Sequence, residues 1–150
     1  MSRKQFSIIF YIYTCIMFFL VLFKFNFTYE RIKESIELFR VSDYKMVNLD
    51  FLSTIKMQIN QKNNWAFLNL FGNTIPFIFY GILFVLSFDT SLIKSILINL
   101  FVVLLIEIIQ LIFVIGTFDI DDIFLNLTSI ILGIILIKYT SFNKRVSDAI

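Results

Sequence analysis

The sequence predicts an all-α integral membrane protein, a four-helix bundle with a long loop or an amphipathic helix between the first and second spans. Hydrophobic residues fill 59% of the 150 positions and charged residues only 16%, which is too apolar a balance for a soluble domain. Four stretches each supply about 20 mainly apolar residues, the length that crosses roughly 30 Å of hydrocarbon. No repeat or low-complexity linker divides the chain, so residues 1–150 are expected to form one domain.

The four spans are expected at residues 5–24, 65–88, 92–115 and 120–138. Arg3 and Lys4 precede the first span as in a signal peptide, but no small-residue cleavage site follows, which favours an uncleaved anchor. Apolar residues repeat at helical spacing within residues 29–40. This segment is therefore expected to be an amphipathic helix on the membrane, or a continuation of the first helix into water.

Basic residues give a weak prediction of orientation. Six lie at the N-terminus, in the 89–94 turn and in the C-terminal tail, and seven are spread over the long segment between the first two spans. The denser group favours both termini in the cytoplasm, because cytoplasmic loops are enriched in Lys and Arg. Residues 116–122, which hold three Asp and no basic residue, are then expected to face outward.

The composition excludes several kinds of chemistry. The chain has no His, so it has no His-based triad, general base or zinc ligand. Its single cysteine, Cys15, lies in an apolar run and allows neither an internal disulfide nor a CxxC site. We expect no organic cofactor and no nucleic-acid partner. The expected partner is the lipid bilayer, and the sequence sets no oligomeric state.

Three sets of polar residues, on spans two, three and four, fall in one half of the bilayer, whereas Asn99 on span three is expected nearer the opposite surface. Alternation of the helices brings the starts of spans two and four and the end of span three to the same side. Polar groups in hydrocarbon cost about 3 kcal/mol each at a helix centre, so each needs a partner or a function. We therefore predict one polar pocket that opens to this surface. Its residues are Asn73, Glu107, Gln110, Asp119, Asp121, Asp122 and Asn126.

Structural roles compete with this functional interpretation. Asp121 and Asp122 would lie in the first turn of span four, where carboxylates cap free N–H groups and complement the helix dipole. Glu107, if protonated, would be a hydrogen-bonding link between helices. The three Asp at 119, 121 and 122 are also candidate ligands for a divalent cation. Their spacing matches an EF-hand loop only superficially, because the Gly at position six and the Glu at position twelve are missing.

Several short motifs occur in a characteristic order on the spans. They are Val47-Asn48-Leu49 followed by Phe51; Gly72-Asn73 followed by Gly81; Glu107-Ile108-Ile109-Gln110; and Phe118-Asp119-Ile120-Asp121-Asp122 with Asn126 and Gly133 downstream. In this order, over about two thirds of the chain, they resemble the VanZ-like family of bacterial membrane proteins. Gly116-Thr117 stands where that family commonly has an Arg, so a counter-charge to the Asp cluster is missing. Arg31 or Arg40 is a hypothetical substitute.

The resemblance implies a location in the bacterial cytoplasmic membrane and a role in the cell envelope. The founding member of the family is associated with low-level resistance to teicoplanin, a lipoglycopeptide that acts at the outer face of this membrane. We therefore expect lowered susceptibility to such antibiotics, through binding or altering a lipid-linked headgroup at the outer leaflet. Two alternatives stay open: a metal-dependent membrane enzyme acting on a lipid or wall precursor, and a small accessory subunit of a membrane complex.

Overall fold

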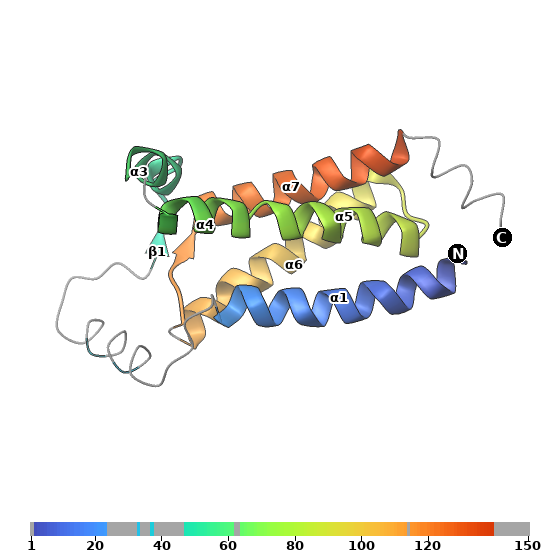
Figure 1. Ribbon diagram of the computed structural model, residues 1–150, viewed down its shortest axis with the longest axis horizontal. Helices are drawn as coiled ribbons and strands as arrows, with labels where there is room; N and C mark the ends of the chain where they lie inside the picture. Colours follow the sequence, from blue (N-terminus) through green and yellow to red (C-terminus); the bar gives the residue numbers. More distant parts are fainter. Residues whose placement is uncertain are drawn as a thin grey trace.

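The computed structural model describes residues 2–23, 33, 37, 47–61, 64–113 and 115–139. In chain order its elements are α1 (Arg3–Phe23), β1 (Val47–Asn48), α3 (Ser53–Gln61), α4 (Asn64–Gly72), α5 (Ile75–Ser87), α6 (Leu92–Ile112), β2 (Phe118–Asp119) and α7 (Ile120–Lys138). The long helices run along a common axis, with β1, β2 and α3 gathered at one end (Figure 1). The start of α1 and the end of α7 lie at the other end.

The described part of the chain contains four helices long and apolar enough to cross a membrane, which confirms the four-span all-α fold class. They cover Arg3–Leu22, Leu70–Ser87, Leu92–Ile112 and Ile120–Lys138. The last agrees with the predicted span, whereas the third ends three residues earlier than predicted. Of the expected amphipathic helix at residues 29–40, only Lys33 and Glu37 are described; both are exposed, and the rest lies outside the described residues.

The second predicted span consists of two helices, α4 and α5, because the chain turns at Asn73 and Thr74. Pro76 lies in the first turn of α5, where its missing N–H leaves no hydrogen bond unmade. The Thr74 hydroxyl donates to the Leu70 carbonyl at 2.6 Å, so it satisfies one of the carbonyls at the end of α4. The break places Asn73 just before the start of α5.

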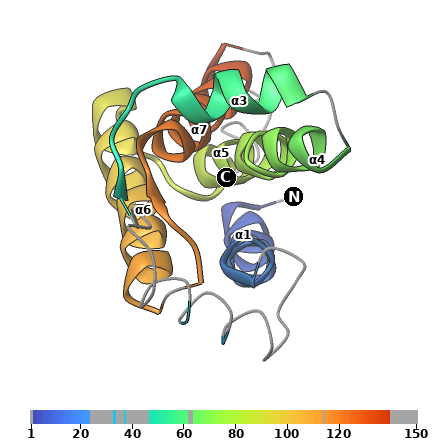
Figure 2. The ribbon, with the colours of Figure 1, turned by 90° about the vertical axis from the view of Figure 1, so that its left-hand side faces the viewer.

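Helices α5 and α7 form the central pair and run in the same direction, with α1 packed on α5 and α6 packed on α7 (Figure 2). Glycines let the central pair approach closely. A Cβ atom at Gly133 would collide with the backbone of Ile78, and one at Gly81 with the backbone of Ile130. Small residues at a helix interface are a common solution in membranes, where packing replaces the hydrophobic effect between helices.

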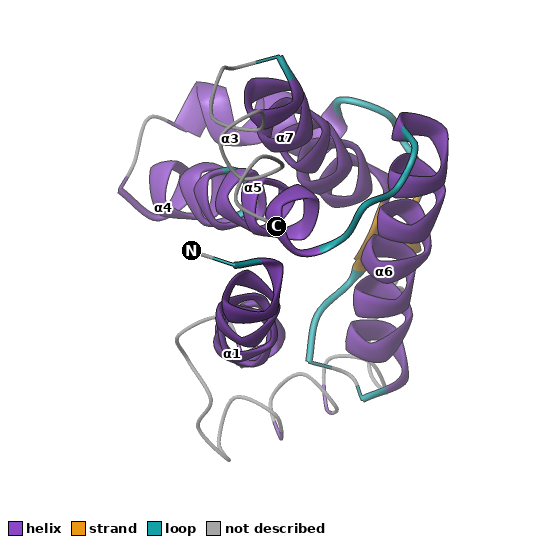
Figure 3. Cartoon of the chain, turned by 90° about the vertical axis from the view of Figure 1, so that its right-hand side faces the viewer, coloured by secondary structure: helices purple, strands orange, loops and turns teal. Residues whose placement is uncertain are grey.

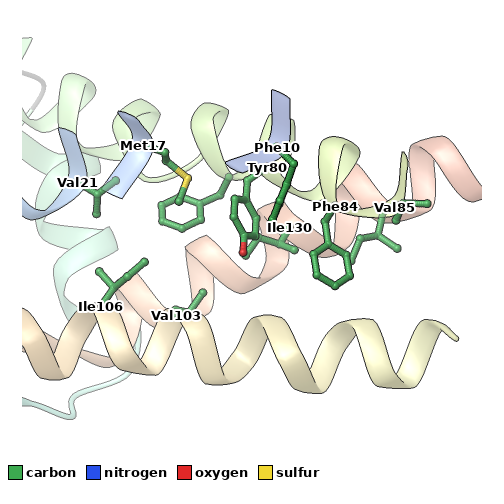
Figure 4. Packing of buried hydrophobic residues seen from close by; sticks show 11 residues of the cluster. Phe10, Met17, Val21, Tyr80, Phe84, Val85, Val103, Ile106 and Ile130 are labelled. Carbon is green, nitrogen blue, oxygen red and sulfur yellow. The ribbon is translucent and has the colours of Figure 1, made fainter. Parts of the chain in front are cut away.

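The apolar core lies between the four spans. Buried side chains from α1 (Phe10, Met17), α5 (Tyr80, Phe84), α6 (Val103, Ile106) and α7 (Ile130) pack together (Figure 4). The outward faces of the spans carry exposed Ile, Leu and Phe, as expected of surfaces that contact lipid. The core therefore holds the four helices in register and fixes which polar residues face one another at the two ends of the bundle.

Candidate functional site: the acidic end of the bundle

The site is the end of the bundle at which α5 and α7 begin, here called the acidic end. It contains the candidate residues Asn73, Glu107, Gln110, Asp119, Asp121, Asp122 and Asn126, all of which are buried. Residues 47–61, here called the strap, lie across this end and comprise β1, the following turn and α3 (Figure 2). Most contacts described below are hydrogen bonds that link the strap, α7 and their neighbours.

Asp119 opens α7. Its backbone is extended, and its Oδ1 atom accepts from the Asp121 N–H at 2.9 Å, so Asp119 is the N-cap of this helix. Asp121 and Asp122 lie in the first turn, as predicted. The capping role itself belongs to Asp119, because only a residue before the first turn can adopt extended backbone and still reach a free helical N–H. One of the three Asp therefore has a complete structural explanation in α7 itself.

Asp121 instead caps a different helix, α3 of the strap. Its carboxylate accepts from the backbone N–H groups of Leu52 at 2.6 Å, Thr54 at 2.9 Å and Ile55 at 3.2 Å. These are the free donors at the start of α3, and hydrogen bonds from them to a carboxylate are of the strong, charge-assisted kind. Asp121 is 0% exposed, so the backbone of the strap replaces the water that would otherwise solvate it.

The strap has a strained residue at this contact. Leu52 has φ of 64°, the left-handed region that residues with a Cβ seldom adopt. This conformation turns its N–H toward Asp121 Oδ1. Strain of this kind costs about 1 kcal/mol and persists only where surrounding contacts hold it. The hydrogen bonds to Asp121 are the contacts that hold it here.

Asp119 ties the strap to α7 a second time. Its Oδ2 atom accepts from the Thr54 hydroxyl at 2.6 Å and from the Asn48 side-chain amide at 3.2 Å. Nearby, β1 pairs in parallel with β2, with Val47 opposite Phe118 and Asn48 opposite Asp119. The Phe51 ring packs edge-on against Phe124 of α7. Strap and α7 are therefore joined by backbone, side-chain and aromatic contacts.

The remaining carboxylates link the spans to one another. Glu107 of α6, 1% exposed, accepts from the Asp119 N–H at 3.0 Å through its Oε2 atom. Asp122 of α7 accepts from the Asn73 side-chain amide at 2.6 Å. The structure thus brings together five of the predicted residues, Asn73, Glu107, Asp119, Asp121 and Asp122, in the half of the bundle predicted for them.

Gln110 and Asn126 are buried but belong to this network less directly. The Gln110 amide donates to the Val21 carbonyl near the end of α1 at 3.1 Å and packs against Gly116. Asn126 lies one turn below Asp122 on the same face of α7, and its side chain leans toward that residue because helical Cβ atoms tilt toward the N-terminus. Among the described residues, nothing donates a hydrogen bond to the buried Oδ1 of Asn126 or the buried Oε1 of Gln110. Each can accept from a donor that enters the site.

The acidic end is rich in acceptors. Asp119 and Asp121 accept only from neutral N–H and O–H groups in the part of the chain that is described. Arg31 and Arg40, the hypothetical counter-charges, lie outside the described residues. No group of three metal-ligating side chains gathers at one point within the described ranges, where Asp119, Asp121 and Asp122 each face different donors. What the arrangement can do directly is accept hydrogen bonds and attract positive charge.

Sequence reasoning missed the strap as part of this site. Asn48, Thr54 and the backbone of Leu52 contact the Asp cluster but were not among the candidates. A signal existed, because Val47-Asn48-Leu49 precedes span two as one of the motifs that carry the family resemblance. Its position beside Asp119 was hidden by a separation of 71 residues along the chain.

A family model described as VanZ/LLP1 matches residues 10–142, which is most of the chain and includes the whole acidic end. No curated protein and no solved structure matches significantly.

Proposed function

Because this chain belongs to the VanZ/LLP1 family, we propose that it lowers the susceptibility of a bacterium to lipoglycopeptide antibiotics of the teicoplanin type. It would do so by binding or altering a lipid-linked headgroup at the outer leaflet of the cytoplasmic membrane. The acidic end is the proposed binding site. Four helices that are long and apolar enough to span a membrane would hold the site at the depth of the lipid headgroups.

The observation that carries this proposal is the excess of buried acceptors at one end of the bundle. Four carboxylates and the two unpartnered amide oxygens of Gln110 and Asn126 lie there. A ligand that complements them carries hydroxyl, amide or ammonium donors, as sugar and peptide headgroups do. Charged and amide groups at membrane depth are costly to retain, which favours a function over mere tolerance.

Access to the site depends on the strap. The α3 helix has no buried residue, and the strap is held to α7 chiefly by hydrogen bonds that it donates to the carboxylates of Asp119 and Asp121. A headgroup arriving from the leaflet therefore meets the strap first. Donors on the headgroup can compete with the strap for the carboxylates, so binding and strap position are expected to be coupled.

The hydrogen bonds that the carboxylates already accept from the protein support a binding role over metal-dependent catalysis. Both oxygens of Asp119 and both oxygens of Asp121 already accept hydrogen bonds from the protein. A divalent cation would have to displace these donors before it gained its usual oxygen ligands. A neutral or cationic donor group can use Asn126 and Gln110 as well, so it need not displace all of these donors at once.

The test compares two buried asparagines. Asn126 and Asn99 both have an unpartnered side-chain oxygen, but Asn99 lies on α6 in the other half of the bundle, where its amide donates to Ser95. In a susceptible host, expression of the wild-type chain should raise the inhibitory concentration of teicoplanin. We expect Asn126→Leu to abolish this rise and Asn99→Leu to preserve it, at matched membrane levels.

Two outcomes would overturn the proposal. If Asn126→Leu at wild-type abundance raises the inhibitory concentration of teicoplanin as much as the wild type does, the acidic end is not the binding site. Metal-dependent turnover of a lipid-linked substrate by the purified chain, lost in Asp122→Asn, would identify an enzyme instead of a binder. Orientation is tested separately by labelling Thr117→Cys in intact cells, in a Cys15→Ser background. Labelling from the outside supports an outward acidic end, and labelling only from the inside reverses it.

A further inference from the structure

The opposite end of the bundle is basic and is not used by the proposed function. Four cations lie at this end, here called the basic end: Arg3 and Lys4 at the start of α1, Lys94 in the first turn of α6, and Lys138 at the end of α7. Among the described residues of this end, Asp89 is the one acid. Figure 3 looks onto it and shows the start of α1, the loop from α5 to α6, and the end of α7.

Two of these cations hold the loop that joins α5 to α6. Arg3 forms an ion pair with Asp89 at 3.1 Å, and the Lys138 Nζ donates to the Thr90 carbonyl at 2.8 Å. The Thr90 hydroxyl in turn bonds to the buried Ser95 hydroxyl at 2.7 Å. The starts of α1 and α6 and the end of α7 are therefore tied to one short loop, so their charges form a single rim.

The other two cations have no such role. Lys4 and Lys94 are both exposed. They lie in the first turns of α1 and α6, and a helix N-terminus carries a positive partial charge because its first N–H groups are unpaired. Helices normally place anions at this position, yet neither first turn contains an acid. Two helix dipoles and two exposed ammonium groups therefore add positive charge to this end of the bundle.

Interfacial features favour a position of this rim at lipid-headgroup depth. Each of α1, α6 and α7 is a membrane-spanning helix that ends at the rim. Tyr139, which follows Lys138, is 80% exposed, and exposed Tyr is enriched at membrane interfaces. Anions at this depth are mainly the phosphates of acidic phospholipids, which attract clustered Lys and Arg next to transmembrane helices.

We propose that the basic end binds the phosphate of an anionic phospholipid, with Lys4 and Lys94 as the contacting ammonium groups. Arg3 and Lys138 hold the loop that joins α5 to α6 at this end. The proposal does not depend on the resistance function or on the acidic end. Under the rule that basic residues face the cytoplasm, the lipid belongs to the cytoplasmic leaflet.

The experiment uses the full chain, purified in detergent and supplied with a mixture of phosphatidylglycerol and phosphatidylcholine. Native mass spectrometry then counts the lipids retained by each chain. We expect the wild type to retain phosphatidylglycerol in preference to phosphatidylcholine. The Lys4→Gln/Lys94→Gln variant should lose this preference by on the order of tenfold, from the attraction of each basic residue to an anionic surface. Both side chains are exposed, so the variant should fold normally, which its thermal unfolding midpoint checks.

Lys56→Gln is the matched control, because it removes an exposed lysine from the strap at the acidic end. It should retain phosphatidylglycerol like the wild type. The single variant Lys94→Gln removes one charge, as Lys56→Gln does, and is compared with it directly. Equal loss of phosphatidylglycerol in these two single variants would mean that only net charge matters, and would overturn the proposal. So would unchanged retention in the double variant. Displacement of the lipid by inorganic phosphate at the same concentration would show that the site binds the free ion and not the phospholipid, and would also overturn the proposal.

Discussion

The two ends of this bundle handle charge in opposite ways. At the acidic end, the carboxylates of Glu107, Asp119 and Asp121 are buried, and backbone N–H groups and neutral side chains solvate them. At the basic end, Lys4 and Lys94 remain exposed. A buried charge needs donors supplied by the protein, and here a separate segment, the strap, supplies them. An exposed charge needs no such segment and stays available to lipid.

The largest effect should come from removing the carboxylate that holds the strap. Asp121→Ala leaves the N–H groups of Leu52, Thr54 and Ile55 without their acceptor. We expect the free energy of unfolding to fall by about 4 kcal/mol, because three N–H groups lose hydrogen bonds to a charged acceptor, each worth roughly 1.5 kcal/mol. Unfolding in detergent, followed by circular dichroism, measures this change.

Asp50→Ala is the control for Asp121, because Asp50 lies on the same strap with an exposed side chain. Its effect should stay within about 0.5 kcal/mol, as for most surface substitutions. If the two variants lose equal stability, the carboxylate of Asp121 is not what joins the strap to α7.

A second prediction concerns the contact that keeps both ends in register. Gly133→Ala places a Cβ atom against the backbone of Ile78, which cannot move aside as a flexible side chain would. Separation of α5 from α7 should cost about 3 kcal/mol, as overpacking does. It should also weaken the Asn73 contact with Asp122 at the acidic end. Thermal unfolding of the purified chain measures the loss.

Gly72→Ala provides the comparison for Gly133, because no atom lies within 4 Å of a Cβ atom at Gly72. It should be neutral or slightly stabilising, since Ala is the better helix former. A destabilisation as large as that of Gly133→Ala would show that loss of glycine as such, and not the close approach of α5 and α7, is responsible.

A smaller effect is expected from one side-chain contact of the strap. Thr54→Val keeps the shape of the residue but removes the hydroxyl that donates to Asp119 at 2.6 Å. The loss should be about 1 kcal/mol, the typical value of one hydrogen bond. Because the change acts locally, faster protease cleavage within residues 47–61 should accompany it. An unchanged rate of cleavage would show that the hydrogen bond from Thr54 to Asp119 does not hold the strap in place.

The smallest effect should occur at the basic end. Arg3→Gln removes the ion pair with Asp89, whose side chain is 80% exposed. Exposed pairs contribute little, so we expect a loss of at most about 0.5 kcal/mol. Repeating the measurement at high salt should abolish even this difference, because salt screens exposed charges. A loss comparable to that of Asp121→Ala would remove the contrast between the two ends.

The spans and most of the site residues were predictable because their signals are local. Apolar runs of sufficient length located the four helices, and helical spacing placed Asp122 and Asn126 on one face of α7. The break between α4 and α5 was less visible. Pro76 marks it, but apolar residues continue on both sides, so hydropathy alone predicts one unbroken helix.

Contacts between residues on different helices were less predictable. Alternation of the helices correctly assigned Gln110 to the acidic half, but not its contact with the Val21 carbonyl of α1. The docking of the strap depends on a two-residue parallel pairing and on Leu52 in a left-handed conformation. Neither produces a periodic pattern, and the residues that stabilise them lie on distant parts of the chain.

That pairing between β1 and β2 also dictates an order of assembly. Asn48 and Asp119 are 71 residues apart, and α4, α5 and α6 are synthesised between them. Helices in membranes generally insert before they pack, so the strap cannot close until the last span is in place. Closure of the strap is therefore a late step of assembly, and protection of its amides from hydrogen exchange would mark chains whose insertion is complete.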